Sequence, residues 1–158
     1  MEPTTVVAVD IGGTKIACGL VTFSGDGEPV VESVERIPTN PLRGGKAVLA
    51  DVIAAVEAAR ARSPRPVAGV GISTGGVVDP RTGDITYANE MMPGWSGTPL
   101  GSAVEEACGI PCRVLNDVHA HALGEARWGG GRGYGSVLVV AVGTGISGAI
   151  VEGGVLAL

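Results

Sequence analysis

The stretch "AVDIGGTKIACGLV", residues 8–21, joins two apolar runs through a turn of Gly12, Gly13, Thr14 and Lys15. Runs rich in β-branched residues around a short glycine turn predict a β-hairpin. The first run reaches the turn through the carboxylate of Asp10. A carboxylate, bare backbone and a cation in one turn indicate an anion held against it, together with a metal. A plain hairpin can also use Gly-Gly, so the rest of the chain decides between the two interpretations.

Outward from this hairpin, the pattern predicts strands that alternate with helices. Leu49, Val52, Ile53 and Val56 share one face of a helix that Ser63-Pro64 ends. Further helices are predicted over 98–109, with Thr98 as N-cap, Pro99 at the first position and Gly109 as terminator, and over 117–128. A turn followed by a strand with alternating apolar and polar residues is predicted over 25–38. Further strands are predicted over 67–73, 111–116 and 136–142, and after residue 148. The fold class is therefore α/β, a mixed sheet with helices on both faces.

An internal sequence repeat, called here the sequence echo, indicates two lobes. "VVAVDIGGTKIACGLV" (6–21) and "LVVAVGTGISGAIV" (138–151) share one plan, an apolar strand, a Gly/Thr turn and a returning apolar strand. More than a hundred residues follow the first copy and almost none the second. Since duplicated units have similar size, residues 1–135 are expected to form one lobe and 136–158 the first hairpin of another, with the chain a fragment.

Composition narrows the class of protein. The chain of 158 residues has 45% hydrophobic residues, 27 glycines and a net charge of −5. This acidic balance disfavours a nucleic-acid partner. No apolar window is long enough for a membrane span, and "MEPTT" does not resemble a signal peptide, so a cytoplasmic protein is expected. Cys18, Cys108 and Cys112 are then free thiols.

The sequence argues against two familiar site patterns. The gap from Cys108 and Cys112 to His119 and His121 is too short for a zinc finger. "GTGISG" (143–148) matches a dinucleotide fingerprint formally, but no helix pattern follows it. Neither glycine turn matches the P-loop, so phosphate would bind to hairpin-turn amides.

The segment 116–125 carries the most chemistry. Asn116 and Asp117 end an apolar strand, where open α/β sheets place ligands, although either residue can simply cap the next helix. His121 and Glu125, four residues apart, suit a surface pair or metal ligands. His119 suits the polar wall of a cleft better than a catalytic base.

The segment "ITYANEMMPGW" (85–95) brings Asn89, Glu90 and Trp95 into one loop. The side chain of Trp95 could simply pack over the edge of the hydrophobic core. An amide beside an exposed aromatic ring also suits a polyhydroxylated ligand.

Five motifs occur in the order found in the repressor–ORF–kinase (ROK) family of sugar kinases, which the chain resembles over essentially its whole length. They are "DIGGTK", "GISTGGVVDPRTG", "PGW", "NDVHAHALGEARWGGGRG" and "VAVGTGISGA". The resemblance implies the fold of the actin/hexokinase-like superfamily. "GISTGG" is similar to the version in N-acetylmannosamine kinases, whereas many glucokinases of the family carry a Pro-Gly version.

The resemblance implies ATP and Mg²⁺ as cofactors and a role for each matching residue. Asp117 would be the general base, and Asp10 would lie at the magnesium-phosphate, directly or through water. Contacts to the sugar would come from Gly76, Asn89 and Asn116. The first phosphate loop would be Gly12, Gly13, Thr14 and Lys15, and the second Gly143, Thr144 and Gly145. A homodimer or higher oligomer is also implied.

The sequence departs from the family in two respects. His119 stands where the family commonly has Asn. The Glu-x-Gly-His sugar motif, the Cys-rich zinc motif and the base pocket of the nucleotide are absent from the 158 residues, so structural zinc is expected only in a part beyond them.

The expected activity is phosphorylation of the 6-hydroxyl of glucose or an N-acetylhexosamine, with residues 1–158 alone inactive. The rivals are a sugar-responsive repressor and a non-catalytic sugar-binding module. A repressor of the family would place a winged DNA-binding domain before the first phosphate motif, for which Asp10 leaves no room. The binding module is favoured if Asp117 is buried in a salt bridge.

Overall fold

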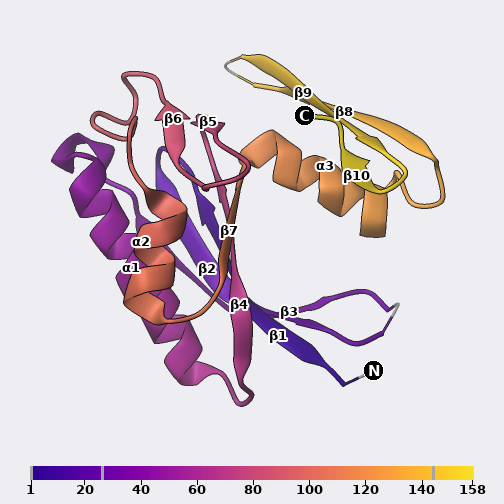
Figure 1. Ribbon diagram of the computed structural model, residues 1–158, viewed down its shortest axis with the longest axis horizontal. Helices are drawn as coiled ribbons and strands as arrows, with labels where there is room; N and C mark the ends of the chain where they lie inside the picture. The colour runs from indigo at the N-terminus through magenta and orange to yellow at the C-terminus, as the bar shows by residue number, and fades with distance from the viewer. Residues whose placement is uncertain (1, 26, 144) are drawn as a thin grey trace. The chain divides into compact units, whose positions relative to one another are not determined.

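The computed structural model describes residues 2–25, 27–143 and 145–158. The chain forms two compact units, Met1–Leu115 and Asn116–Leu158 (Figure 1). Within the described residues, no helix combines the length and apolar character needed to cross a membrane.

The first unit contains a five-stranded sheet in the order β3-β2-β1-β4-β7. Its strands are β1 (Thr4–Ile11), β2 (Lys15–Phe23), β3 (Val30–Pro38), β4 (Val67–Thr74) and β7 (Cys112–Asn116). Between them lie the helices α1 (Gly45–Arg62) and α2 (Leu100–Cys108), the 3₁₀ turn η1 (Pro41–Arg43), and the short pair β5 (Val77–Val78) and β6 (Ile85–Tyr87).

The strand pairing confirms the predicted hairpin and the mixed sheet. β1 runs antiparallel to β2, and the last pair before the turn is Ile11 opposite Ile16. On its other side β1 runs parallel to β4, which brings Asp10 beside Ser73. The parallel step is possible because α1 carries the chain back across the sheet between β3 and β4.

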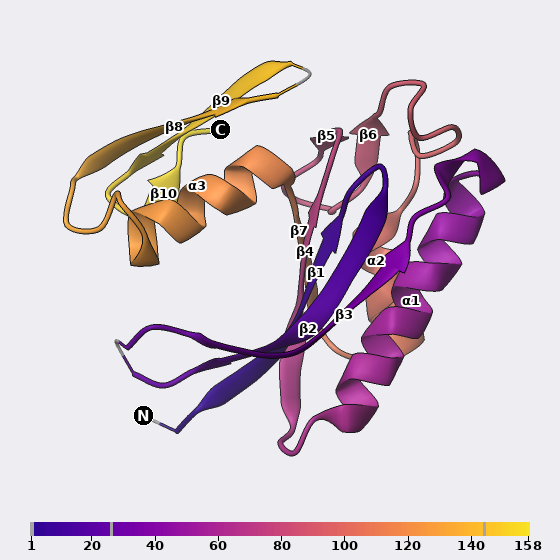
Figure 2. The same ribbon diagram turned by 180° about the vertical axis from the view of Figure 1, so that it is seen from behind.

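The core of this unit lies between the sheet and its two helices. Val7, Val9 and Ile11 alternate along β1 onto one face and are at most 4% exposed. Helix α1 covers that face with Val48, Val52 and related residues, and α2 lies beside it (Figures 1 and 2). Of the predicted stripe of α1, Val52 and Val56 are buried, whereas Leu49 and Ile53 are only partly buried; the helix ends before Ser63 as expected.

Two local predictions are wrong. Thr98 does not cap α2: the N-cap residue is Pro99 and no side chain caps this end, while the hydroxyl of Thr98 points to the carbonyl of Gly94. Strand β3 does not alternate between buried and exposed residues; only Ile37 is partly buried. β3 is the edge strand, and Ser33 in the left-handed region interrupts its pairing with β2, as a bulge does.

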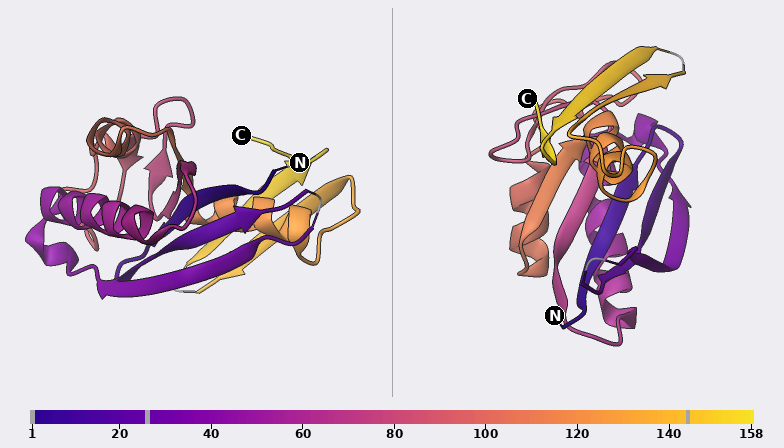
Figure 3. Two further views of the ribbon diagram at one scale, coloured as in Figure 1. Left: turned by 90° about the horizontal axis from the view of Figure 1, so that it is seen from below. Right: turned by 90° about the vertical axis from the view of Figure 1, so that its right-hand side faces the viewer.

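The second unit is one helix against a three-stranded sheet of order β10-β9-β8. Its elements are α3 (Asp117–Trp128), β8 (Ser136–Val142), β9 (Ile146–Glu152) and β10 (Val155–Leu156). Helix α3 runs along one face of this sheet (Figure 3). Val118 and Ala122 of the helix pack there against Ala149 and Val151.

The two units repeat one topology. In each, the first strand returns through a glycine turn to an antiparallel second strand, and a third strand pairs outside the second. The sequence echo between residues 6–21 and 138–151 therefore corresponds to a structural one. The compact units divide at Leu115–Asn116, so α3 belongs with the second meander by its contacts, whereas the sequence echo places the lobe boundary at residue 135.

Candidate active site

The turn between β1 and β2 has the properties of an anion site. The N–H of Gly12 donates to the carbonyl of Lys15 at 2.9 Å, which closes the turn. Within the described ranges, no protein acceptor lies in reach of the N–H groups of Gly13 and Thr14. The side chain of Lys15 is exposed and forms no ion pair with any described residue. Unpaired amides beside a free ammonium group make a nest for phosphate oxygens.

Asp10 is exposed at the end of β1, just before this turn. Its Oδ1 accepts a hydrogen bond from the hydroxyl of Ser73 at 2.5 Å, across the parallel pair of strands. Among the described residues, Oδ2 has no protein partner. One fixed carboxylate with one open oxygen fits Mg²⁺, which takes few protein ligands and keeps several waters. No group of three or more His, Cys, Asp and Glu residues capable of holding a metal occurs in the described part of the chain.

The second glycine turn joins β8 to β9. The N–H of Gly143 donates to the carbonyl of Gly145 at 2.9 Å. Thr144, the third predicted member, lies outside the described residues. β8 runs back along α3, from Val137 beside Gly131 at the C-terminal end of the helix. The turn therefore lies at the same end of this unit as the N-terminus of α3 (Figures 1 and 2).

Asn116 and Asp117 occupy that N-terminus. Oδ1 of Asn116 accepts from the N–H of Val118 at 3.0 Å, so Asn116 is the N-cap of α3, as the capping interpretation predicted. Oδ1 of Asp117 accepts from the same N–H at 2.9 Å. Asp117 is exposed, and no cation forms a salt bridge with it in the described ranges. The condition that would favour a non-catalytic module is therefore not met.

Gly76 and Asn89 lie close together in the first unit. Gly76 has a φ of 103°, and a Cβ there would stand 2.7 Å from the carbonyl oxygen of Tyr87 and 3.5 Å from the Cβ of Ala88. Asn89 follows directly and is exposed; its Oδ1 accepts from the N–H of Met91 at 3.1 Å. The Cε of Met91 is in turn 4.0 Å from the Cβ position of Gly13. Two predicted sugar contacts thus lie in loops that reach the glycine turn between β1 and β2.

Trp95 has no part in a ligand surface. Its side chain is 0% exposed, and its Nε1–H donates to the hydroxyl of buried Thr74 at 3.2 Å. The pairing of Asn89 with an exposed aromatic ring, considered for a polyhydroxylated ligand, is therefore wrong. A large apolar ring with one satisfied polar atom is better accommodated in the core than at the surface.

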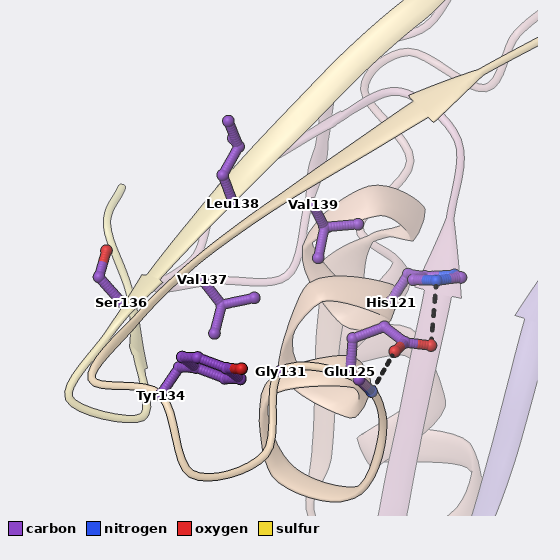
Figure 4. Close-up of a pocket in the computed structure, with 9 residues that line it drawn as sticks. His121, Glu125, Gly131, Tyr134, Ser136, Val137, Leu138 and Val139 are labelled. Atoms are coloured by element: carbon purple, nitrogen blue, oxygen red, sulfur yellow. Dashed lines mark hydrogen bonds and ion pairs between the residues drawn. The ribbon is translucent and has the colours of Figure 1, made fainter.

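A pocket of about 470 Å³ in the second unit lies between the C-terminal half of α3, the loop after it and β8 (Figure 4). Among the described residues, none of those predicted to bind phosphate or sugar or to act as the base lines it. His121 and Glu125 form the predicted surface pair there: Nε2 lies 3.6 Å from Oε1, and the two side chains are 64% and 42% exposed. Glu125 also accepts the N–H of Gly130 through Oε2, and its carbonyl accepts those of Gly129 and Gly131. These bonds tie down the glycine loop.

Sequence reasoning missed two residues that hold the first turn, Ser73 and Thr39. Thr39 is 0% exposed and touches the turn through its N–H and its hydroxyl. Ser73 lies in the motif "GISTGGVVDPRTG" without a role assigned to it, and Thr39 lies outside the five motifs. Both contacts depend on which strands pair and in which register.

The three cysteines are buried free thiols, as predicted. Burial raises the pKa of Cys18 from 9.0 to about 11 and that of Cys112 from 9.0 to about 12. It also raises the pKa of Cys108. Thiols that stay protonated at neutral pH are poor nucleophiles and poor metal ligands.

Comparison with known proteins identifies the family. The ROK family model matches residues 6–157, and the chain belongs to the ROK family. It is 36% identical over 147 residues to a glucokinase from Streptomyces coelicolor, covering 93% of this chain and 43% of the relative. A putative xylose repressor from a Caldicellulosiruptor species is 35% identical over 99 residues, 61% of this chain and 24% of the repressor.

Among solved structures, the ROK family glucokinase from Streptomyces griseus in complex with glucose and AMPPNP superimposes with a TM-score of 0.80 at 35% identity. The match covers 96% of this chain and 46% of the glucokinase. The fold is therefore that of the ROK sugar kinases, of the actin/hexokinase-like type. The chain spans less than half the length of these glucokinase relatives.

Proposed function

We propose that the protein to which this chain belongs is an ATP-dependent kinase that phosphorylates the 6-hydroxyl of a hexose, either glucose or an N-acetylhexosamine. The observation that carries the proposal is the first turn: free amides at Gly13 and Thr14, an exposed Lys15 and an exposed Asp10 fixed by Ser73. Phosphoryl transfer depends mainly on such positioning and neutralisation of charge. Family membership and the glucokinase relatives support the same assignment.

In this proposal the two turns bind the phosphates of ATP. Gly12, Gly13, Thr14 and Lys15 form one phosphate loop and Gly143, Thr144 and Gly145 the other. Asp10 holds Mg²⁺, directly or through water, and the bound cation neutralises charge on the phosphates. Glycines suit both turns because they let backbone amides approach anionic oxygens closely.

Gly76, Asn89 and Asn116 orient the sugar in the same proposal. The turn uses only Oδ1 of Asn89, which leaves its Nδ2 group to donate to a sugar hydroxyl. Asp117 takes the proton from the 6-hydroxyl as that oxygen attacks the γ-phosphorus and the bond to the β-phosphate oxygen breaks. The exposed Asp117 has Oδ2 without a protein partner in the described residues, which leaves an acceptor for that proton.

We further propose that residues 1–135 belong to one lobe and 136–158 begin a second, in a protein that is cytoplasmic and assembles as a homodimer or higher oligomer. The repeated meander β1-β2-β3 and β8-β9-β10 supports the duplication.

The test is an assay of the full-length gene product with ATP and Mg²⁺ on glucose, N-acetylglucosamine and N-acetylmannosamine. We expect ATP-dependent phosphate transfer to one of these sugars well above the others. Uniformly absent turnover would overturn the kinase assignment. The same preparation is titrated with operator-like duplex DNA; salt-dependent, sugar-released binding would favour a repressor instead.

A further inference from the structure

We propose that Thr39 is the positioning residue of the first phosphate turn: this one buried threonine binds the carbonyls of Gly12 and Thr14 and thereby leaves the amides of Gly13 and Thr14 free for anionic oxygens. The inference rests on the proposed function and adds a residue that the family motifs quoted above do not contain. Thr39 follows the last residue of β3, Pro38, which pairs with Lys15.

Two hydrogen bonds join Thr39 to the turn. Its hydroxyl donates to the carbonyl of Gly12 at 2.6 Å, and its N–H donates to the carbonyl of Thr14 at 3.1 Å. The carbonyls on either side of Gly13 are thus both directed to one residue with no exposed surface. A carbonyl that turned toward the anion would repel it, so this arrangement determines which polar groups the turn presents.

Thr39 is itself held from the helix side. The guanidinium of Arg43 donates to the carbonyl of Thr39 at 3.1 Å and forms an ion pair with Asp51 of α1. The residue after Thr39, Asn40, has a φ of 46°, which turns the chain from β3 into η1. The backbone of Thr39 therefore has fixed partners on both sides, and its hydroxyl reaches the turn without a long flexible side chain.

The test compares Thr39→Val, which keeps the shape and removes the hydroxyl, with Thr39→Ser, which keeps the hydroxyl. Both are made in the full-length protein. The matched control is Thr22→Val, which removes a buried hydroxyl from strand β2. This hydroxyl is hydrogen-bonded to that of Thr5 at 2.9 Å and does not contact the turn. We expect Thr39→Val to raise the KM for ATP by roughly tenfold, the equivalent of about 1.4 kcal/mol, while the KM for sugar stays within about twofold. Thr39→Ser should restore the KM for ATP.

A second readout does not depend on catalysis. Hydrogen exchange of the peptide 10–16, measured by mass spectrometry, should speed up in Thr39→Val and remain unchanged in Thr22→Val and Thr39→Ser, because the bond from Gly12 to Lys15 opens more often. If the wild type transfers no phosphate, the proposed function fails while this measurement still tests the role of Thr39. Should Thr39→Val not fold, Thr39→Ala against Thr39→Ser gives the same comparison. Unchanged exchange, or an equal rise of both KM values, would overturn the proposal.

Discussion

At the scale of single residues, Asp10 and Asp117 present their carboxylates in different ways. Asp10 lies at the end of a strand and receives the hydroxyl of Ser73 from the neighbouring strand. Asp117 lies in the first turn of a helix and receives the N–H of Val118. In each case one oxygen is bonded and the side chain remains exposed. Such a group is held in place and can still accept a cation or a proton.

Asp117→Asn is the first prediction. An amide oxygen can still accept the N–H of Val118, so the helix and the sugar affinity should be preserved, but an amide cannot take the proton from the hydroxyl. Turnover of the full-length enzyme should fall by roughly 10²–10⁴-fold with little change in the KM for sugar. Glu106→Gln, an exposed change on α2, is the control. A variant that kept most of its rate would remove Asp117 from the role of base.

Gly76→Ala is the second prediction. The positive φ and the carbonyl of Tyr87 at 2.7 Å leave no room for a Cβ, so we expect a loss of about 1–3 kcal/mol in the free energy of unfolding. Gly71→Ala, in the same strand region with nothing within 4 Å of its Cβ position, should change stability by less than about 1 kcal/mol. Urea titration of both variants measures the difference; equal effects would contradict the steric explanation.

At the scale of elements, helices α1 and α3 each contain a glycine, but only the glycine of α1 is required by a close contact. Gly45 begins α1 and lies against the 93–95 loop: its N–H donates to the carbonyl of Pro93 at 3.0 Å, and a Cβ would overlap the carbonyl of Gly94. Gly124 is in the middle of α3 and has nothing within 4 Å of its Cβ position. The first glycine allows a close contact between elements, and the second only weakens its helix.

The third prediction is the contrast between these two positions. Gly124→Ala should stabilise the protein by about 0.5–1 kcal/mol through helix propensity, while Gly45→Ala should destabilise it by several times that amount because the helix must move off the loop. Thermal unfolding followed by circular dichroism measures both. A stabilising Gly45→Ala would show that the contact between α1 and Gly94 is unimportant.

At the scale of the whole molecule, the sheet of the second unit has one uncovered apolar face. α3 covers Val137 and Val139, while the alternate residues of β8 and β9 are exposed, among them Leu138 at 66%, Val142 at 76% and Ile146 at 78%. Apolar surface of this kind, next to an unpaired strand edge at β8, favours association.

The fourth prediction follows from this face. Purified residues 1–158 should self-associate on sizing chromatography and should show no hexose phosphorylation with ATP and Mg²⁺. Leu138→Lys combined with Ile146→Lys should shift the chain toward monomer, whereas Leu42→Lys, at an 88% exposed apolar side chain outside this sheet, should not. A wild-type monomer that turned over sugar as fast as the full-length protein would contradict both parts.

The fifth prediction concerns the buried thiols. Folding raises the pKa of Cys18 to about 11 and of Cys112 to about 12, so above pH 9 the unfolded chain releases thiol protons that the folded chain retains. The free energy of unfolding therefore falls as pH rises from about 9 toward 12. The urea midpoint should drop more between about pH 8.5 and about pH 10.5 in the wild type than in Cys18→Ala/Cys112→Ala. Parallel curves would contradict this linkage.

The sequence by itself determined the main helices and strands and the two glycine turns, but not the short strands β5, β6 and β10. Apolar alternation around Gly12 and Gly13 specified a hairpin, the stripe containing Val52 and Val56 specified α1, and the repeat of the glycine turn near Gly143 specified a second hairpin. These features are local. Residues that are neighbours in the sequence determine strand and helix periodicity, and they determine where a tight turn needs glycine. The candidate residues of both turns came from the same local patterns and from the resemblance of the motifs.

Only the tertiary structure decided which side chains meet. It paired Ser73 with Asp10, because the register of β1 against β4 sets the two residues side by side. It also buried Thr39 against the turn of Gly12–Lys15, which lies far from Thr39 in the sequence. It also placed Trp95 in the core and left Thr98 without a capping role. Each of these outcomes depends on long-range packing and register, which hydrophobic periodicity does not encode.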